Sequence, residues 1–292
     1  MSWPRPGAGA AWEPQVLAWS FIPPGFDSVW AFLTLGSLSA FLFSLTKAGF
    51  GGSAGLLAVP LMIFACGGDV RLATGILLPI LIAADYVAVI SWLGKWDRRA
   101  VGMLLPGTVL GIAAGWVLLR LLGRLDAAGG RELTNAWMKL GVGAIALAFV
   151  ALQAARAVRG RPLAFRPVLW QGTLAGTTAG LTSTLAHAAG PIVGMYMLPQ
   201  QMPKGRFVAS TALYFWVANQ LKLVPYFVED MIGPDTLGAG VMLLPAIAGG
   251  AVLGIYLHRR VGQRPFTGIV YTLLALAGGG LCYHGAKALL FH

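Results

Sequence analysis

Long apolar stretches separated by short polar segments make up most of the chain. A helix that crosses a bilayer needs about 20 residues, and the second and seventh stretches are too short to cross. The pattern predicts an all-α polytopic membrane protein with about eight to ten membrane segments. The stretches are Val29–Leu45, Ala54–Cys66, Leu72–Leu93, Val101–Leu122, Ala136–Ala155, Val168–Ala186, Ile192–Leu198, Phe207–Val228, Leu237–Leu257 and Phe266–Leu290.

The composition excludes a water-soluble protein. Charged residues account for only 11% of the 292 residues and apolar residues for 57%, whereas soluble domains contain roughly 25% charged residues. The net charge of +11 indicates basic loops beside a membrane rather than a nucleic-acid partner. The two cysteines have neither disulfide nor metal-knuckle spacing, and we expect no metal or cofactor. Residues 1–28 lack the pattern of a cleavable signal peptide and are expected to lie at the membrane interface.

The two halves of the chain resemble each other. Five positions recur at one constant spacing, and Leu45-Thr46 recurs as Leu181-Thr182 at a slightly smaller one. The match predicts a first repeat over residues 29–155, a basic linker over 156–167 and a second repeat over 168–292. The five positions are Pro106, Gly111, Gly115, Arg120 and Gly123, which recur as Pro245, Gly250, Gly254, Arg259 and Gly262.

The distribution of charge predicts that the repeats have inverted topology. Four arginines between positions 156 and 166 place the linker in the cytoplasm by the positive-inside rule. Counted outward from the linker, the basic segment Lys95–Arg99 falls inside and the acidic segment Glu229–Asp235 falls outside. Each repeat is then a broken or re-entrant helix hairpin followed by three crossings, and both termini are expected outside.

Glycine-rich breaks interrupt an apolar segment at corresponding places in the two halves. One lies within Ser44–Pro60 and the other at Ala189-Gly190-Pro191. Glycines commonly serve close helix packing, which suffices to explain Gly111 and Gly250. Broken helices within inverted repeats, however, are typical of secondary transporters, and the substrate site lies where the breaks meet.

The polar residues at and beside the breaks form a candidate site for an anion. Short helices that start near Ser53 and Pro191 would present free N–H groups and a favourable dipole. Lysines, amides and hydroxyls would add donors, although the hydroxyls can instead bond to the preceding helical turn. The candidates are Thr46, Lys47, Gly49, Gly51, Gly52, Thr182, Ser183, Thr184, His187, Gly190, Pro191, Asn219, Gln220 and Lys222.

Ionisable residues inside membrane segments are rare and commonly functional. Lys47 has the alternative of snorkelling to an interface, and His187 that of a hydrogen-bonded packing residue. His187, which titrates near neutral pH, and Asp85 are candidates for gating or proton coupling. Inverted topology separates Asp85 from Lys222 by roughly 10 Å along the membrane normal, which favours separate roles. The ordinary alternative for Asp85 is a hydrogen bond with a neighbour such as Tyr86.

Three segments carry a resemblance to a known family: LTKAGFGGSAGLLAVP in the first half, and GLTSTLAHAAGPIVGMYMLPQQMPK with RFVASTALYFWVANQLKLVPYF in the second. They resemble the sulfite exporter TauE/SafE family, also known as the 4-toluene sulfonate uptake permease family, over most of the chain from Val29. Ser53 stands where the family has a third glycine. The resemblance implies a secondary transporter of sulfite or organosulfonate-type anions in the bacterial inner membrane, working without ATP.

The residues themselves leave other functions open. A transporter of another small organic anion, an anion channel and a membrane-embedded enzyme are the alternatives. The chain lacks paired acids, metal-ligand spacing or a nucleophile–base pair, which argues against the enzyme. The expected partners are a small sulfur-containing anion, the lipid bilayer and a coupling ion such as the proton, because sulfite protonates near neutral pH. The direction of transport and a homodimer stay open.

Overall fold

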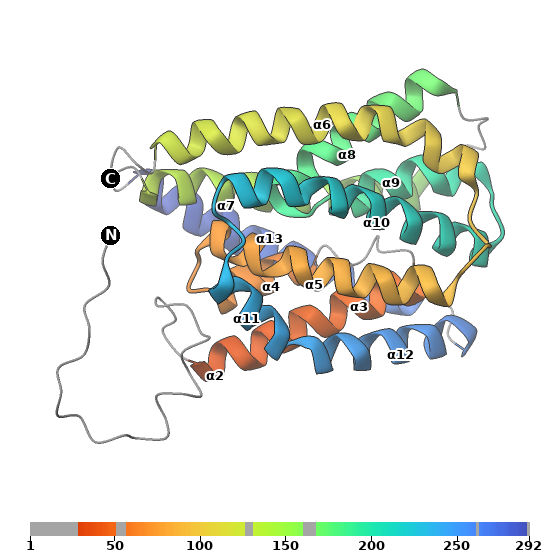
Figure 1. Ribbon diagram of the computed structural model, residues 1–292, viewed down its shortest axis with the longest axis horizontal. Coiled ribbons are helices and arrows are strands. Elements are labelled where there is room, and N and C mark those ends of the chain that lie inside the picture. Colours follow the sequence, from red (N-terminus) through yellow and green to blue (C-terminus); the bar gives the residue numbers. More distant parts are fainter. Residues whose placement is uncertain (1–28, 51–56, 126–130, 160–167, 261–262, 291–292) are drawn as a thin grey trace.

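The protein is described from a computed structural model over residues 29–50, 57–125, 131–159, 168–260 and 263–290. Within these ranges every element is a helix, and the long helices run side by side as an elongated bundle (Figure 1). The predicted all-α class is therefore confirmed for this part of the chain.

Each half of the chain contains a short helix after its first long helical segment. The first half contains α2 (Val29–Ala31), the π-helical turn η1 (Phe32–Gly36), α3 (Ser37–Phe50), α4 (Ala58–Ala65), α5 (Val70–Ser91), α6 (Arg98–Leu125) and α7 (Arg131–Arg159). The second half contains α8 (Leu169–Ala186), α9 (Gly190–Met197), the 3-10 turn η4 (Leu198–Gln200), α10 (Lys204–Val228), α11 (Pro234–Met242), α12 (Leu244–Arg260) and α13 (Gln263–Leu290).

Several of these helices are long and apolar enough to cross a membrane. Within the described ranges, Val29–Phe50, Val70–Ser91 and Arg98–Arg124 meet both conditions, and the bent pair of α11 and α12 meets them when it is counted as one span. The chain is thus a helical membrane protein. The larger number of membrane segments indicated by the sequence stays a prediction.

One predicted stretch, Leu237–Leu257, is two helices rather than one. The axes of α11 and α12 differ in direction by 48°, and the chain turns at Leu243, just before Pro245. Pro245 lies in the first turn of α12, where the missing proline N–H has no partner to lose. Its counterpart Pro106 lies inside the continuous helix α6, so the same residue type marks a bend in one half and not in the other.

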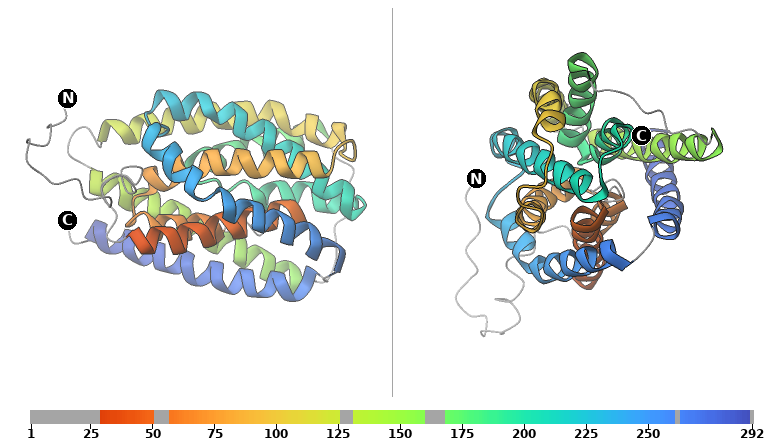
Figure 2. Two further views of the ribbon diagram at one scale, coloured as in Figure 1. Left: turned by 60° about the horizontal axis from the view of Figure 1, so that its bottom comes forward. Right: turned by 90° about the vertical axis from the view of Figure 1, so that its right-hand side faces the viewer.

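Helices from opposite halves pack along each other. Helix α6 lies along α8, α12 along α3, α7 along α13, and α5 along α10, as the view down the bundle shows (Figure 2). Glycines bring the first two pairs into backbone contact, because a Cβ at Gly111 would overlap the Thr177 carbonyl and one at Gly250 the Phe41 carbonyl. The packing role expected of these two glycines is confirmed.

The contacts along α6 define the two ends of the bundle. Gly107 faces Thr173 and Gly111 faces Thr177, so α6 and α8 run in the same direction from a common end, which we call the Arg98 end. At the opposite end Arg120 Nε donates to Glu229 Oε1 at 2.9 Å. We call this the Glu229 end.

The backbone contact between α6 and α8 predicts a sharp difference between two glycines of the same helix. Gly107→Ala is expected to destabilise the protein by about 1–3 kcal/mol, because its Cβ has no room against the Thr173 carbonyl. Gly102→Ala meets nothing within 4 Å and is expected to keep or raise stability, since alanine favours helix over glycine. Thermal unfolding in detergent measures both, and equal stabilities would contradict the contact.

Candidate functional site

The second predicted break is present. Helix α8 ends at Ala186, His187 adopts the left-handed conformation with φ 50°, and α9 begins at Gly190 with Pro191 in its first turn. The N–H of His187 still bonds to the Ser183 carbonyl at 2.9 Å, which closes the helix in the manner usual for a left-handed cap. Two residues then suffice to reverse into the next helix.

Helix α3 extends further toward the first predicted break than the sequence indicated. Helix α3 continues to Phe50, so Gly49 lies within its last turn, where a Cβ would overlap the Gly254 carbonyl of α12. Gly49 therefore serves helix packing there. The predicted break residues Gly51, Gly52 and Ser53 lie outside the described residues, and α4 starts at Ala58.

Buried polar side chains from four helices gather inside the bundle, and we call this group the polar cluster. Helix α3 contributes a lysine, α5 a carboxylate, α8 and its cap a serine and a histidine, and α10 an amide and a second lysine. Each has 6% exposure or less. The members are Lys47, Asp85, Ser183, His187, Asn219 and Lys222.

One side of the cluster is an ion pair between consecutive long helices. Lys47 Nζ donates to Asp85 Oδ1, and Asn219 Nδ2 donates to the other carboxylate oxygen. The rings of Phe43 and Phe215 lie 4.9 and 5.1 Å from the ammonium, within cation–π range. Lys47 does not snorkel to an interface, and Asp85 is bonded to Lys47 and Asn219 rather than to the predicted neighbour Tyr86. The sequence feature that could have indicated this pair is the presence of opposite charges, Lys47 and Asp85, in consecutive long apolar segments.

The other side of the cluster surrounds Lys222. Its Nζ lies 2.9 Å from Ser183 Oγ, 3.3 Å from the Ser183 carbonyl and 2.9 Å from His187 Nδ1. Within the described ranges Lys222 forms no salt bridge, and the separate roles expected for Asp85 and Lys222 stay a prediction. Lys222 is completely buried and is held by a hydroxyl, a carbonyl and an imidazole.

The hydroxyls of the threonine candidates bond to the preceding turn of their own helix, the alternative to a binding role given above. Thr46 Oγ1 donates to the Phe43 carbonyl at 2.9 Å, and Thr182 and Thr184 bond to carbonyls one turn back at 2.8 Å each. Ser183 differs because its hydroxyl faces Lys222.

Within the described ranges, some buried donors on α3 and α10, two of the helices that carry the cluster, have no hydrogen-bond partner. Gln220 Nε2 and Trp216 Nε1 are one turn apart on α10, and Ser44 Oγ is one turn before Lys47 on α3. Only Gln220 was a candidate from the sequence, because serine and tryptophan are common in apolar helices and carry no charge to single them out. A buried unpaired donor costs about 1–3 kcal/mol, so these groups are suited to a ligand that supplies acceptors.

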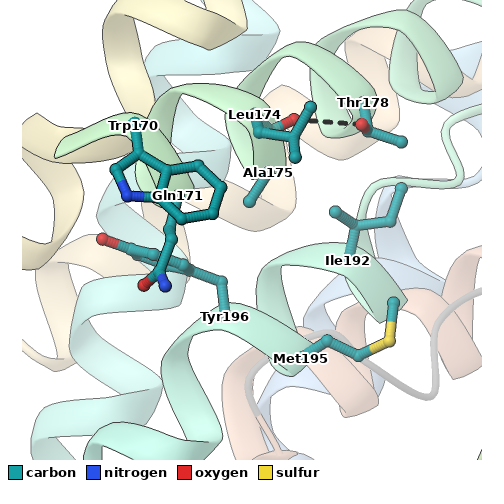
Figure 3. A pocket seen from close by; sticks show the side chains of 8 residues that line it. All are labelled: Trp170, Gln171, Leu174, Ala175, Thr178, Ile192, Met195 and Tyr196. Atoms are coloured by element: carbon teal, nitrogen blue, oxygen red, sulfur yellow. Dashed lines mark hydrogen bonds between the residues drawn. The ribbon is translucent and has the colours of Figure 1, made fainter. Parts of the chain in front are cut away.

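A separate groove lies on the outside of α8 and α9. It has a volume of about 470 Å³ and mostly apolar walls, and Figure 3 shows its side chains. No member of the polar cluster lines it, so it is not the candidate site. It is lined by Trp170, Gln171, Leu174, Ala175, Thr178, Ile192, Met195 and Tyr196.

A profile of the sulfite exporter TauE/SafE family matches residues 37–281, a range that includes the whole polar cluster. The chain belongs to the sulfite exporter TauE/SafE family. TauE/SafE proteins are transporters and not enzymes, so this member is a multi-pass membrane transport protein. No curated protein and no solved structure matches the chain.

The buried Lys47–Asp85 ion pair predicts a large loss of stability when the carboxylate is replaced by an amide of the same shape. Asp85→Asn leaves the Lys47 ammonium buried without a counter-charge and is expected to cost about 3–5 kcal/mol. The double variant Lys47→Met, Asp85→Asn is expected to recover much of that loss, because position 47 then no longer holds a buried charge without its partner. Thermal unfolding in detergent measures both variants.

Glu229→Gln is the matched control for that measurement. It weakens an ion pair with Arg120, whose side chain is 55% exposed, and pairs of that kind contribute about 0–1 kcal/mol. If Asp85→Asn were no more destabilising than Glu229→Gln, the buried pair would not have the importance assigned to it.

Proposed function

We propose that this TauE/SafE protein is a secondary transporter that moves sulfite or a small organosulfonate across the bacterial inner membrane by alternating access. The supporting observation is an excess of buried positive charge. The polar cluster contains two lysines and one carboxylate, and the carboxylate is bonded to Lys47. Because a buried charge without a counter-charge is costly, the cluster favours a small anion as its ligand.

The donors around the cluster fit an oxyanion of sulfur. Such an anion presents several oxygens in a compact group and needs several donors, of which charged ones bind best. The Lys222 ammonium supplies three N–H groups, and on α3 and α10 the buried donors of Ser44, Trp216 and Gln220 have no partner among the described residues. The N-terminus of α9, directly after the break at His187, adds a favourable dipole.

Reciprocal contacts support the inverted repeat. Gly111 and Gly250 are repeat equivalents, and Phe41 and Thr177 are related by the spacing that relates Leu45-Thr46 to Leu181-Thr182. Gly250 packs on Phe41 as Gly111 packs on Thr177. Each half therefore contacts the other through equivalent positions. Two copies related in this way would bring their broken hairpins to a common centre.

The same spacing relates Lys47 to Ser183. Lys47 bonds to a polar residue of α5 and Ser183 to one of α10, so equivalent positions face both long helices. This supports a single binding centre shared between the halves.

Charge at the two ends of the bundle supports the predicted orientation. The Arg98 end carries Arg98, Arg99 and Lys204, whereas at the other end Glu229 and Asp230 outweigh Arg120, which is paired with Glu229. By the positive-inside rule the Arg98 end faces the cytoplasm and the Glu229 end the periplasm. Both termini then lie on the periplasmic side.

Lys222 is the residue on which this function depends most. Lys222→Met keeps the length of the side chain and removes the charge, and is expected to lower sulfite or organosulfonate uptake into proteoliposomes at least tenfold. Lys287→Met, at an exposed lysine of α13, is the control and is expected to transport like the wild type. Wild-type uptake by Lys222→Met protein, with normal thermal unfolding, would refute the role of Lys222.

Direct binding separates the proposed substrates from other anions. Purified protein is titrated with sulfite, sulfoacetate, taurine, sulfate and lactate, and the sulfur anions with a pyramidal SO₃ group are expected to bind most tightly. Preference for lactate would identify a transporter of another organic anion. Saturation and counterflow in proteoliposomes are expected of a transporter and would exclude a channel.

A further inference from the structure

When Lys222 carries its usual ammonium charge, the contacts of His187 determine which of its nitrogens carries a proton. Nε2 lies 2.9 Å from the Thr74 carbonyl oxygen. A carbonyl can only accept, so Nε2 must donate and carries hydrogen. Nδ1 lies 2.9 Å from Lys222 Nζ, and an ammonium has no lone pair. Nδ1 is therefore the acceptor, and the imidazole is neutral.

Lys222 is satisfied in its charged form by the same geometry. Its three N–H groups meet three acceptors, the Ser183 hydroxyl, the Ser183 carbonyl and His187 Nδ1. A proton added to Nδ1 would place an N–H group against an N–H group and two positive charges in contact. The hydrogen bond between Lys222 and His187 is thus intact while Lys222 is charged and the imidazole is neutral. Protonation of the imidazole at Nδ1 breaks it.

We propose that His187 is the binding site of a transported proton, and that its protonation releases Lys222 to accept the anion. The inference rests on the proposed function and specifies its coupling. A proton from water binds to Nδ1, the Lys222 ammonium keeps its own proton, and the hydrogen bond between them is lost. The freed N–H group of Lys222 and the new N–H of His187 both face the anion, so one proton and one anion bind together.

The other groups around His187 do not supply this proton. From α5 it is faced by Thr74, through the carbonyl that already accepts from Nε2. From α10 Tyr226 packs beside the ring, at 5.7 Å between centroids, and donates its hydroxyl to the Thr184 carbonyl. Among the described residues, the charged groups that act on His187 are Lys222 and Lys47, and Lys47 is paired with Asp85.

The charge of the cluster then stays the same through binding. Without ligands it holds two lysines, one carboxylate and a neutral imidazole. The proton adds one positive charge and a monovalent sulfonate adds one negative charge. The empty and loaded clusters carry equal charge, so the transport step is electroneutral and is not driven by the membrane potential.

Asparagine is the best-matched replacement for His187. The residue has φ 50°, and asparagine occupies this left-handed region more readily than other non-glycine residues. Its amide oxygen can accept from Lys222, but the amide does not take up a proton in the physiological range. His187→Asn should therefore fold, keep Lys222 in place and lose the proton site.

Methanesulfonate is the probe, because it stays a monovalent anion throughout the pH range and carries no proton of its own. In proteoliposomes a methanesulfonate gradient is expected to acidify the lumen with one proton per anion, and a potassium–valinomycin potential is expected to leave the wild-type rate unchanged. His187→Asn is expected to lower the proton flux at least tenfold, and its residual anion flux is expected to respond to the potential.

Binding in detergent gives a second readout that does not require transport. Wild-type affinity for methanesulfonate is expected to rise up to tenfold for each unit by which pH falls, the limit for linkage to one proton. His187→Asn is expected to bind weakly and independently of pH. His284→Asn, at an exposed histidine of α13, is the control and is expected to behave as the wild type.

The outcomes separate the two proposals. Wild-type transport without proton flux, potential-dependent wild-type transport, or a retained pH dependence in His187→Asn would each overturn the assignment of the proton to His187 while leaving the transported anion intact. If wild-type protein bound neither methanesulfonate nor sulfite at any pH, the proposed function itself would fail, and the coupling with it.

Discussion

The bonded trio of Lys47, Asp85 and Asn219 is the interaction on which the interior depends. It ties α3, α5 and α10 together in the interior of the bundle, where all three side chains are buried. An unpaired charge there would cost several kcal/mol, so each of these helices can approach the others only in the arrangement that satisfies all three side chains. Apolar packing alone is less selective in a membrane, because lipid tails compete equally well for an apolar helix face. The polar contacts therefore specify how the helices fit.

Lys222 stands in contrast to this trio. The carboxylate that could neutralise it is bonded to Lys47 instead, and Lys222 is left with a hydroxyl, a carbonyl and a neutral imidazole. Neutral acceptors hold an ammonium less strongly than a carboxylate does. The protein thus contains one lysine fixed by a permanent counter-charge and another held by contacts that a small anion can replace, and this difference is what the proposed transport uses.

The sequence predicted the helical class, the second break and the interior position of the ionisable residues, because these follow from long apolar runs and from glycine and proline at fixed places. It also pointed to Asp85 and Lys222 as residues without a mutual contact. It did not reveal that Asp85 pairs with Lys47, since that depends on how far α3 continues beyond Leu45, and α3 runs through Gly49 to Phe50. Ser44 and Trp216 were missed for a related reason: an uncharged donor in an apolar helix shows its importance only when its surroundings are known.

The bend at Leu243 was equally hidden, because Pro106 and Pro245 match in sequence while only one of them begins a helix. Backbone geometry allows a proline in the first turn of a helix and, at a cost, inside one. The packing of the surrounding helices decides which of the two occurs.

The glycine contacts have a mechanical consequence for a two-part molecule of this kind. Helix α3 lies against α12 and α6 against α8, with backbone touching backbone at Gly250 and Gly111, so each pair joins a helix of the first half of the chain to one of the second half. Under the proposed alternating access, these close contacts favour movement of each pair as one unit. The moving bodies would then contain helices from both halves, and the boundary between them would not coincide with the linker.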